Sequence, residues 1–321
     1  MLTPLLLAVT QAAIFQDKTG DGEWFEEPID RGLTLPRGWM SVELRLDSKR
    51  STAFRNGRGR VVPYGDGTVF RSSRAWLNVS QGFSDRATLY LELPYLRSHL
   101  HNDLGADITT IALGDAHAGL VYDLAPEGLY AQLDLKTPSG VEWPHDFTNG
   151  TTGFLTGTGT THLTLTLHER MPLGPGVAHA WAEGTWRIPG IVGYVVEKDG
   201  FGNGWLDAGD SVGGGATGSL PLGSRALLTL GGQAEFHQAS QIGTSGASVW
   251  SIDKKALART GGLWAFATGE LLFSVSEHWG LCYDLQWQAL GTDSRVFGGL
   301  GLEEFSPQPG ITHGLALEGR W

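Results

Sequence analysis

Cysteine is nearly absent from this sequence, since Cys282 is the only one in 321 residues. A single thiol excludes a disulfide framework and a zinc cluster of the CxxC type. Positive charge is also scarce, with 23 basic residues against 34 acidic ones and a net charge of −11. A chain this acidic, without a basic stripe, is not a general nucleic-acid binder, and no nucleic-acid partner is expected.

Long apolar runs are missing as well. No stretch reaches the roughly 18 apolar residues that a membrane-spanning helix needs, which excludes a helical membrane protein. Yet 41% of the residues are hydrophobic, too many for a disordered chain. Glycine, with 47 residues, and tryptophan, with 12, are abundant. Together they are typical of an all-β chain with many turns and aromatic girdles.

Alternation of polar and apolar residues is the strongest pattern in the chain. Between residues 129 and 136, Leu or Ala fills every odd position, and Tyr, Gln, Asp and Lys fill the even ones. A period of two is that of a β-strand. The segments predicted as strands in this way are 37–48, 68–82, 86–98, 109–124, 128–138, 153–169, 176–189, 211–221, 223–238, 260–275, 279–291 and 312–321.

The connections between these twelve segments alternate between very short turns and long polar loops. The long loops lie near 49–67, 139–152, 190–210, 239–259 and 292–311. A soluble sandwich has no reason for such alternation, whereas an outer-membrane barrel requires it, with apolar residues facing lipid. The predicted fold is all-β: a 12-stranded antiparallel transmembrane β-barrel of the outer-membrane type, with short periplasmic turns and long extracellular loops. Its expected location is the bacterial outer membrane, and its expected partners are outer-membrane lipid and the barrel-assembly machinery.

The N-terminus resembles a secretory signal. An apolar run from Leu2 to Val9 precedes small residues, so residues 1–13 are predicted to be a signal peptide cleaved near Ala12 or Ala13. No Lys or Arg precedes the run, which leaves a buried first strand open as the alternative. Residues 14–36 are expected to form a periplasmic N-terminal segment. The barrel is expected over 37–321, ending in the aromatic Trp321.

If the apolar face of each strand meets lipid, the opposite face lines the lumen. The pore-lining residues predicted by this parity are Glu43, Arg45, Arg74, Trp76, Glu92, Asp115, Asp134, Lys136, Trp181, Glu183, Arg187, Arg225, Glu235, Glu270, Asp284, Glu318 and Arg320. With Asp47 and Asp123 included, eleven acids face six bases. The lumen is therefore expected to be net acidic and weakly cation-preferring. The alternative is that the charges only pair across strands and fill the interior.

One acidic segment resembles an EF-hand calcium loop. Its candidate calcium ligands are Asp199, Asn203, Asp207 and Asp210. Position 3 is Phe201, which offers no side-chain oxygen, and a weaker match starting at Asp17 is also incomplete. A calcium site in an extracellular loop and a solvated acidic turn both stay open. No other cofactor is expected.

An enzymatic barrel is the first alternative to a channel. The nearest match to the His-x-Ser-Asn-Gly stretch of a barrel phospholipase is His145 to Gly150, which has one residue too many and Thr in place of Ser. An added residue moves a strand side chain to the opposite face, away from its base. No catalytic residue is predicted, and the chain is not expected to be an enzyme. A structural or adhesive barrel is the second alternative.

Three stretches carry a family resemblance. They are GFSDRATLYLELPYL (Gly82 to Leu96), LGDAHAGLVYDL (Leu113 to Leu124) and LDLKTPSG (Leu133 to Gly140). Over residues 70–190 the chain resembles the bacterial outer-membrane family named for the MetA pathway of phenol degradation. The resemblance implies passage of small hydrophobic or aromatic molecules. The expected function is an outer-membrane channel or transporter for passive uptake of a small-molecule solute.

Overall fold

The structure is a computed structural model that describes most of the chain from residue 33 to residue 320. Its gaps are 56–60, 64, 66, 102, 106, 126–127, 141–159, 198–199, 208, 224, 240, 245–254, 257–260, 277–278, 291–305 and 308–310. The predicted signal peptide and the stretch from His145 to Gly150 lie outside the described residues. Within them, no helix is long and apolar enough to cross a membrane.

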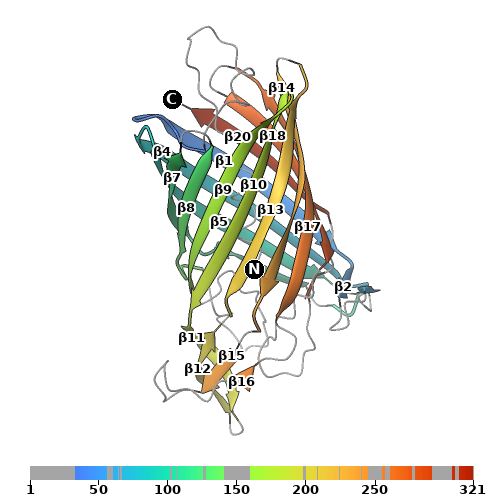
Figure 1. Cartoon of the computed structure of the whole chain (residues 1–321). Helices are drawn as coiled ribbons and strands as arrows, with labels where there is room; N and C mark the ends of the chain where they lie inside the picture. Colours follow the sequence, from blue (N-terminus) through green and yellow to red (C-terminus); the bar gives the residue numbers. More distant parts are fainter. Residues whose placement is uncertain are drawn as a thin grey trace.

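Twelve strand positions close into one antiparallel barrel (Figure 1). In order around the wall they are β1 (Met40–Ser51), β4 (Val69–Ser84), β5 (Ala87–His101), β6 (Asp107–Leu113) with β7 (His117–Ala125), β8 (Leu129–Lys136), β9 (Thr161–Leu173), β10 (Gly176–Ile188), β13 (Ser211–Pro221), β14 (Ala226–His237), β17 (Gly262–Ser274), β18 (Trp279–Leu290) and β20 (Ile311–Arg320). β20 pairs with β1 from Ser41–Arg320 to Lys49–Thr312, which closes the wall. The predicted fold class is confirmed.

The fourth strand position is interrupted. The sequence predicts one strand over 109–124, but β6 ends at Leu113 and β7 begins at His117. Opposite the break, β5 carries Pro94, which has no backbone N–H to donate to a ladder. The Gly114 amide instead donates to the Pro94 carbonyl at 2.8 Å. Three residues therefore stand against two at this point, as in a β-bulge.

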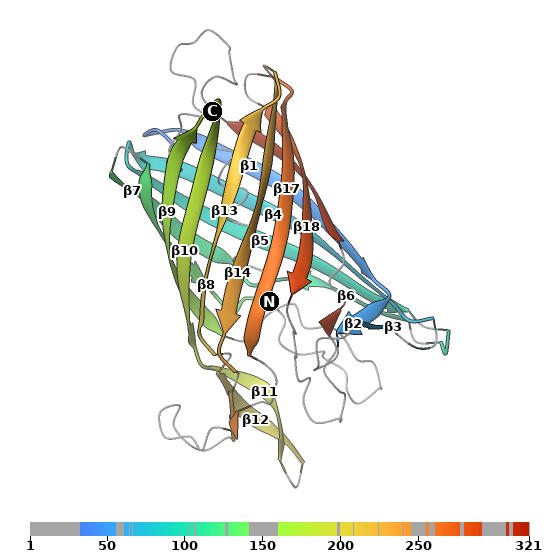
Figure 2. The same ribbon diagram turned by 45° about the vertical axis from the view of Figure 1, so that its right-hand side comes forward.

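Two smaller sheets lie outside the barrel wall. One contains β11 (Gly190–Glu197), β12 (Gly200–Asp207), β15 (Gln241–Thr244) and β16 (Lys255–Ala256), and the other contains β2 (Ala53–Arg55), β3 (Val61–Pro63) and β19 (Ser306–Pro307). The first sheet projects beyond the end of the barrel opposite the C-terminus (Figures 1 and 2). The sequence predicts only loops here, because frequent glycines in 190–207 hide the period of two.

The side chains divide by parity into an apolar outer wall and a polar interior. In β1, Leu44 and Leu46 are 50% and 52% exposed, while Glu43, Arg45 and Asp47 between them are buried. The other strands follow the same rule, so the exposed face of the barrel is the apolar one. Trp186 and Trp287 also point outward, each about half exposed. This distribution is the inverse of a soluble protein and suits a lipid surrounding.

The outer wall generates the first prediction. Leu91 lies in the first half of β5, on the exposed apolar face, so Leu91→Arg should lower the free energy of unfolding by up to about 2–4 kcal/mol, the cost of a cation within the apolar band. Urea unfolding of the refolded protein in lipid vesicles measures this. The matched control is Glu92→Gln, one residue further along and facing inward, which should leave the barrel folded. Equal tolerance of both changes would contradict the assignment of the two faces.

Candidate functional site in the barrel lumen

Most of the predicted pore-lining side chains lie inside the barrel. The buried ones are Glu43, Arg45, Trp76, Glu92, Asp115, Asp134, Lys136, Trp181, Glu183, Arg187, Glu235, Glu270 and Asp284. Arg74 and Glu318 are partly exposed, and Arg320 ends β20 with a side chain outside the described set. Arg225 is exposed, which contradicts its inward placement: the strand starts at Ala226, not at 223, so Arg225 lies in the turn and parity does not apply.

Carboxylates dominate the interior. Nine buried acids, counting Asp47, face three buried cations, which are Arg45, Lys136 and Arg187. Two carboxylate pairs even stand directly opposite each other across neighbouring strands, Glu43 with Glu318 and Glu270 with Asp284. Like charges in such positions repel. Among the described residues, the interior therefore holds more carboxyl groups than cationic side chains.

Arg45 is the centre of the acidic half of the lumen. Its Nε lies 2.8 Å from Asp47 Oδ1, and its Nη2 lies 2.6 Å from Asp284 Oδ2. Asp47 also accepts a hydrogen bond of 2.9 Å from the Trp76 indole. Glu92 Oε1 and Glu270 Oε2 are buried and have no hydrogen-bond partner in the described part of the chain. Buried carboxylate oxygens of Asp123 and Asp284 also lack a hydrogen-bond partner there.

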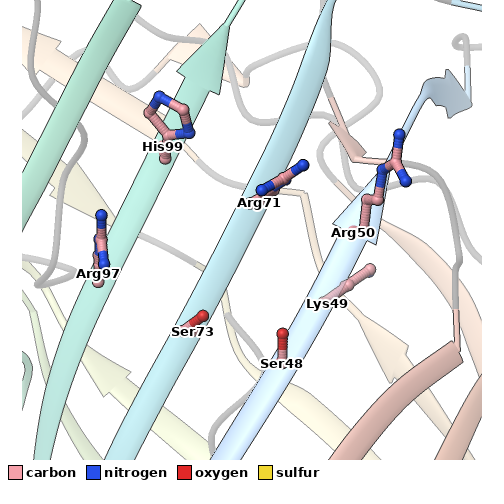
Figure 3. Close-up of a pocket in the computed structure, with 7 residues that line it drawn as sticks. All are labelled: Ser48, Lys49, Arg50, Arg71, Ser73, Arg97 and His99. Atoms are coloured by element: carbon pink, nitrogen blue, oxygen red, sulfur yellow. The ribbon is translucent and has the colours of Figure 1, made fainter.

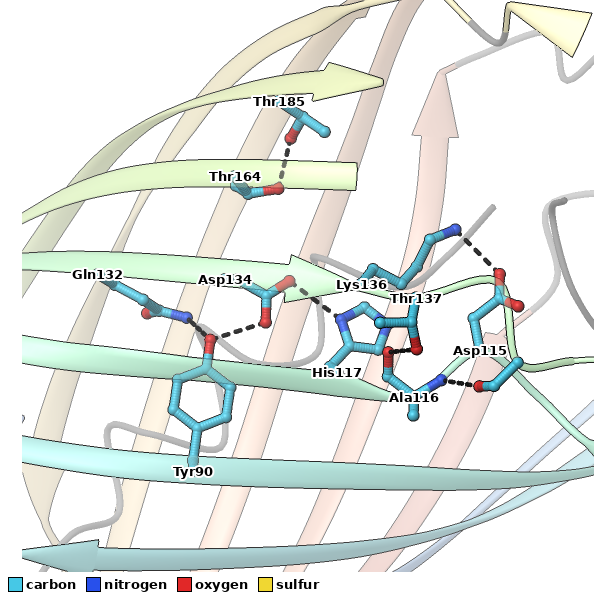
Figure 4. A network of polar contacts seen from close by, with 11 residues as sticks. Tyr90, Asp115, Ala116, His117, Gln132, Asp134, Lys136, Thr137, Thr164 and Thr185 are labelled. Atoms are coloured by element: carbon cyan, nitrogen blue, oxygen red, sulfur yellow. Dashed lines mark hydrogen bonds and ion pairs between the residues drawn. The ribbon is translucent and has the colours of Figure 1, made fainter. Parts of the chain in front are cut away.

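A chain of hydrogen bonds crosses five strand positions on the other half of the lumen. Figure 4 shows its centre, where Gln132 donates to the Tyr90 hydroxyl at 2.9 Å, and Tyr90 donates to Asp134 at 2.8 Å. His117 Nδ1 reaches the second Asp134 oxygen at 3.1 Å. At the other end, His168 Nε2 lies 3.1 Å from Gln132 Oε1.

The direction of this chain is fixed by its members. An amide oxygen only accepts, so His168 donates through Nε2, and a neutral His168 must then accept through Nδ1 from the His179 ring 3.1 Å away. Every donor therefore points toward the Asp134 carboxylate. Such aligned bonds strengthen one another in a region of low dielectric, and they hold this part of the wall rigid.

The Tyr90 ring occupies space that only glycine leaves free. Tyr90 stands opposite Gly119 in the β5–β7 ladder. A Cβ atom at Gly119 would clash with the Tyr90 hydroxyl and the Leu133 carbonyl. Trp181 leans over Gly215 on the β10–β13 ladder in the same manner. Large inward side chains opposite glycine fill the lumen closely.

We therefore predict that Gly119→Ala displaces Tyr90 and lowers the free energy of unfolding by about 1–3 kcal/mol, the usual cost of overpacking. Gly280→Ala is the matched control, since that inward glycine would place its Cβ 3.6 Å from Leu272, an ordinary contact. Urea unfolding distinguishes the two variants. A Gly119 variant as stable as the control would show that the Tyr90 site is not closely packed.

Two further ion pairs line the wall. Lys136 Nζ lies 3.1 Å from Asp115 Oδ2, at the break between β6 and β7 (Figure 4). On the far side, Arg187 lies 3.7 Å from Glu235, which also contacts His237 at 3.1 Å. The five inward histidines, His117, His162, His168, His179 and His237, are all buried. Among the described residues no group of His, Cys, Asp or Glu is arranged to hold a metal ion.

The chain just before β1 runs inside the short-turn end of the barrel. Leu33 and Leu35 are 1% and 0% exposed. Leu33 packs in a cluster with Tyr90, Val121 and Tyr130, and the Leu35 amide donates to Thr88 Oγ1 at 2.6 Å. The sequence assigns these residues to the periplasmic N-terminal segment, and the structure places them within the mouth at the short-turn end. We call residues 33–36 the strap.

The calcium candidates do not form the expected loop. Asn203 and Asp207 lie in strand β12, and Asp199 lies outside the described residues. Asp210 accepts a hydrogen bond of 2.9 Å from the Arg187 amide. The calcium site stays a prediction, since Asp199 and the side chains of Asn203 and Asp207 lie outside what the structure describes.

Comparisons with known proteins support the fold. No protein-family model matches the chain, and no curated protein sequence matches it. An outer membrane channel from Pseudomonas putida F1 is similar in structure, with a TM-score of 0.62 and 16% identity over 95% of this chain and 100% of that chain. The translocator domain of the autotransporter NalP from Neisseria meningitidis has a TM-score of 0.47 and 10% identity, covering 88% of each chain. A mutant of TodX, a monoaromatic hydrocarbon channel, has a TM-score of 0.46 and 10% identity, covering 89% of this chain and 90% of that chain.

The fold and its apolar outer wall define the class of protein. The chain is a 12-stranded β-barrel of the outer-membrane type. Its location is the bacterial outer membrane.

Proposed function

We propose that the chain is a narrow passive channel for small molecules across the outer membrane. The observation that carries this proposal is the closed barrel whose interior is polar, charged and closely filled. A barrel that only anchored a loop or an adhesive surface would have no need for unneutralised carboxylates along its interior. A wide diffusion pore would leave its lining exposed, whereas thirteen predicted lining residues here are under 10% exposed.

The charge of the lumen supports a preference for cations. Unpartnered oxygens of Glu92 and Glu270 and the close pair Glu43–Glu318 create a negative potential along the path. Rings of acidic side chains select cations by this electrostatic effect.

The solute class follows from two features. The lumen contains the buried aromatic rings of Trp76, Trp181, Trp264, Tyr90 and Phe266, which offer stacking surfaces to a flat molecule. The sequence also resembles the phenol-degradation family of outer-membrane proteins. Both support small hydrophobic or aromatic compounds as the transported class, and neither supports a bulky or strongly anionic solute.

Conductance in a planar bilayer tests the channel. The refolded protein should give small, stable current steps and a cation-selective reversal potential in a KCl gradient. The triple variant Glu43→Gln, Glu92→Gln, Glu270→Gln should move that potential toward zero or reverse its sign. Glu169→Gln, which removes an exposed carboxylate on the outer wall of β9, should not change it. No current from a folded barrel, with and without the strap, would contradict the proposal.

The strap should limit the conductance. Each buried leucine contributes about 1.5–3 kcal/mol of burial free energy, so Leu33→Ser with Leu35→Ser should release the strap from Tyr90 and Thr88 and enlarge the unit current. The control is Leu222→Ser at the same end of the barrel, where Leu222 is 52% exposed. An unchanged unit current in the double variant would show that the strap does not lie in the conducting path.

A further inference from the structure

The outer wall of the barrel carries a basic patch that the channel function does not explain. It lies on β1, β4 and β5, around a pocket of about 390 Å³ lined by Ser48, Lys49, Arg50, Arg71, Ser73, Arg97 and His99 (Figure 3). Arg50, Arg71 and Arg97 are exposed, and they occupy the outward parity of their strands. We call these three arginines with His99 the rim patch.

The strand registers show how abruptly the wall changes character. One row across the three strands is Leu44, Leu77 and Leu93, and the next outward row is Leu46, Ala75 and Tyr95. The following rows are Ser48, Ser73 and Arg97, and then Arg50, Arg71 and His99. The apolar wall therefore passes within two rows into a polar and then a cationic surface.

The height of the rim patch matches the outer headgroup region. Arg50 stands ten residues beyond Met40, which begins β1 at the end of the short turns. At about 3.3 Å per residue and a tilt of about 40°, ten residues rise by roughly 25 Å, the height of the apolar band in such barrels. The rim patch thus lies at the edge of the hydrocarbon, on the side of the long loops.

The rim patch brings cationic side chains next to one another. Arg50 stands directly opposite Arg71, and Arg71 stands opposite His99, positions in which like charges repel. No ion pair or hydrogen bond joins the side chains of Arg50, Arg71 or Arg97 to the described part of the chain. His99 itself pairs with Asp107, whose carboxylate lies 2.5 Å from the His99 ring. Such a cluster of like charges favours the binding of an external anion.

Five other strands, β9, β10, β13, β14 and β17, carry no such feature among their described residues at this end of the wall. The outward residues there include Leu163, Trp186, Ile188, Val212, Phe236 and Leu263, which are all apolar. The rim patch is therefore local and is not the general chemistry of the rim.

We propose that the rim patch binds the phosphate groups of an outer-leaflet lipid, with the acyl chains of that lipid lying on the Leu46, Ala75 and Tyr95 row. Arginine suits this ligand because its planar guanidinium donates two parallel hydrogen bonds to phosphate oxygens. The continuity of the cationic rows with the apolar rows selects a lipid, which presents both surfaces, over a free anion.

The test uses the refolded full-length protein in detergent and bisphosphorylated lipid A as the probe. Binding is followed by the rise in thermal unfolding temperature during a lipid titration. The triple variant Arg50→Gln, Arg71→Gln, Arg97→Gln should bind at least about tenfold more weakly, because charge-assisted bonds to phosphate are lost. Arg225→Gln, which removes an exposed arginine at the opposite end, is the matched control and should bind as the unaltered protein does.

Several outcomes would overturn the proposal. They are equal binding by the triple variant, equal binding of dephosphorylated lipid A, and full competition by millimolar inorganic phosphate. A requirement for divalent cations would also overturn it, since it would mean that Asp107 holds the lipid through a metal bridge. Binding that survives chelation of divalent ions and needs both the phosphates and the arginines supports it.

Discussion

Hydrocarbon offers no hydrogen bonds to a peptide backbone, and that single constraint organises this molecule. Every amide and carbonyl at membrane depth must find a partner within the protein, so the sheet has to close. The β1–β20 ladder provides that closure. Closure in turn fixes parity, because alternate side chains of each strand then point either at lipid or into a confined interior. Most large apolar side chains lie on the outer wall, and polar side chains fill most of the interior.

A polar core of this kind has to be packed as closely as an apolar one. A large side chain on one strand faces a glycine on the next, as Tyr90 does at Gly119 and Trp181 does at Gly215. Hydrogen bonds directed toward Asp134 satisfy one half of the interior, and Arg45 between Asp47 and Asp284 organises the other. Carboxylate oxygens without a hydrogen-bond partner in the described residues occur in both halves, since Glu92 stands opposite His117 and Glu270 stands opposite Asp284.

The sequence allows most of the barrel to be predicted, because the period of two survives wherever both faces are strongly constrained. Strand β8, read from Leu129 to Lys136, is the clearest example. Prediction fails where a local exception overrides the pattern. Pro94 lies within β5, whose own alternation is unbroken. The interruption falls on the neighbouring strand position, between β6 and β7.

Other features depend on contacts that no local pattern records. Alternation in the sequence gives Arg225 an inward position, but Arg225 lies in the turn before β14. Leu33 and Leu35 look like part of a soluble tail, and only their contacts with Tyr90 and Thr88 reveal the strap. The rim patch cannot be recognised in the sequence, since Arg50, Arg71 and Arg97 lie on three different strands and become neighbours only through the strand registers.

The central claim is that the lumen conducts, but only narrowly. The most direct measurement is swelling of liposomes that contain the refolded protein, in isosmotic solutions of solutes graded from glycine to the trisaccharide raffinose. The account predicts entry of glycine, a steep fall with solute size, and no entry of raffinose. Raffinose entering at a rate similar to that of glycine would contradict the filled lumen, and exclusion of glycine as well would contradict the channel.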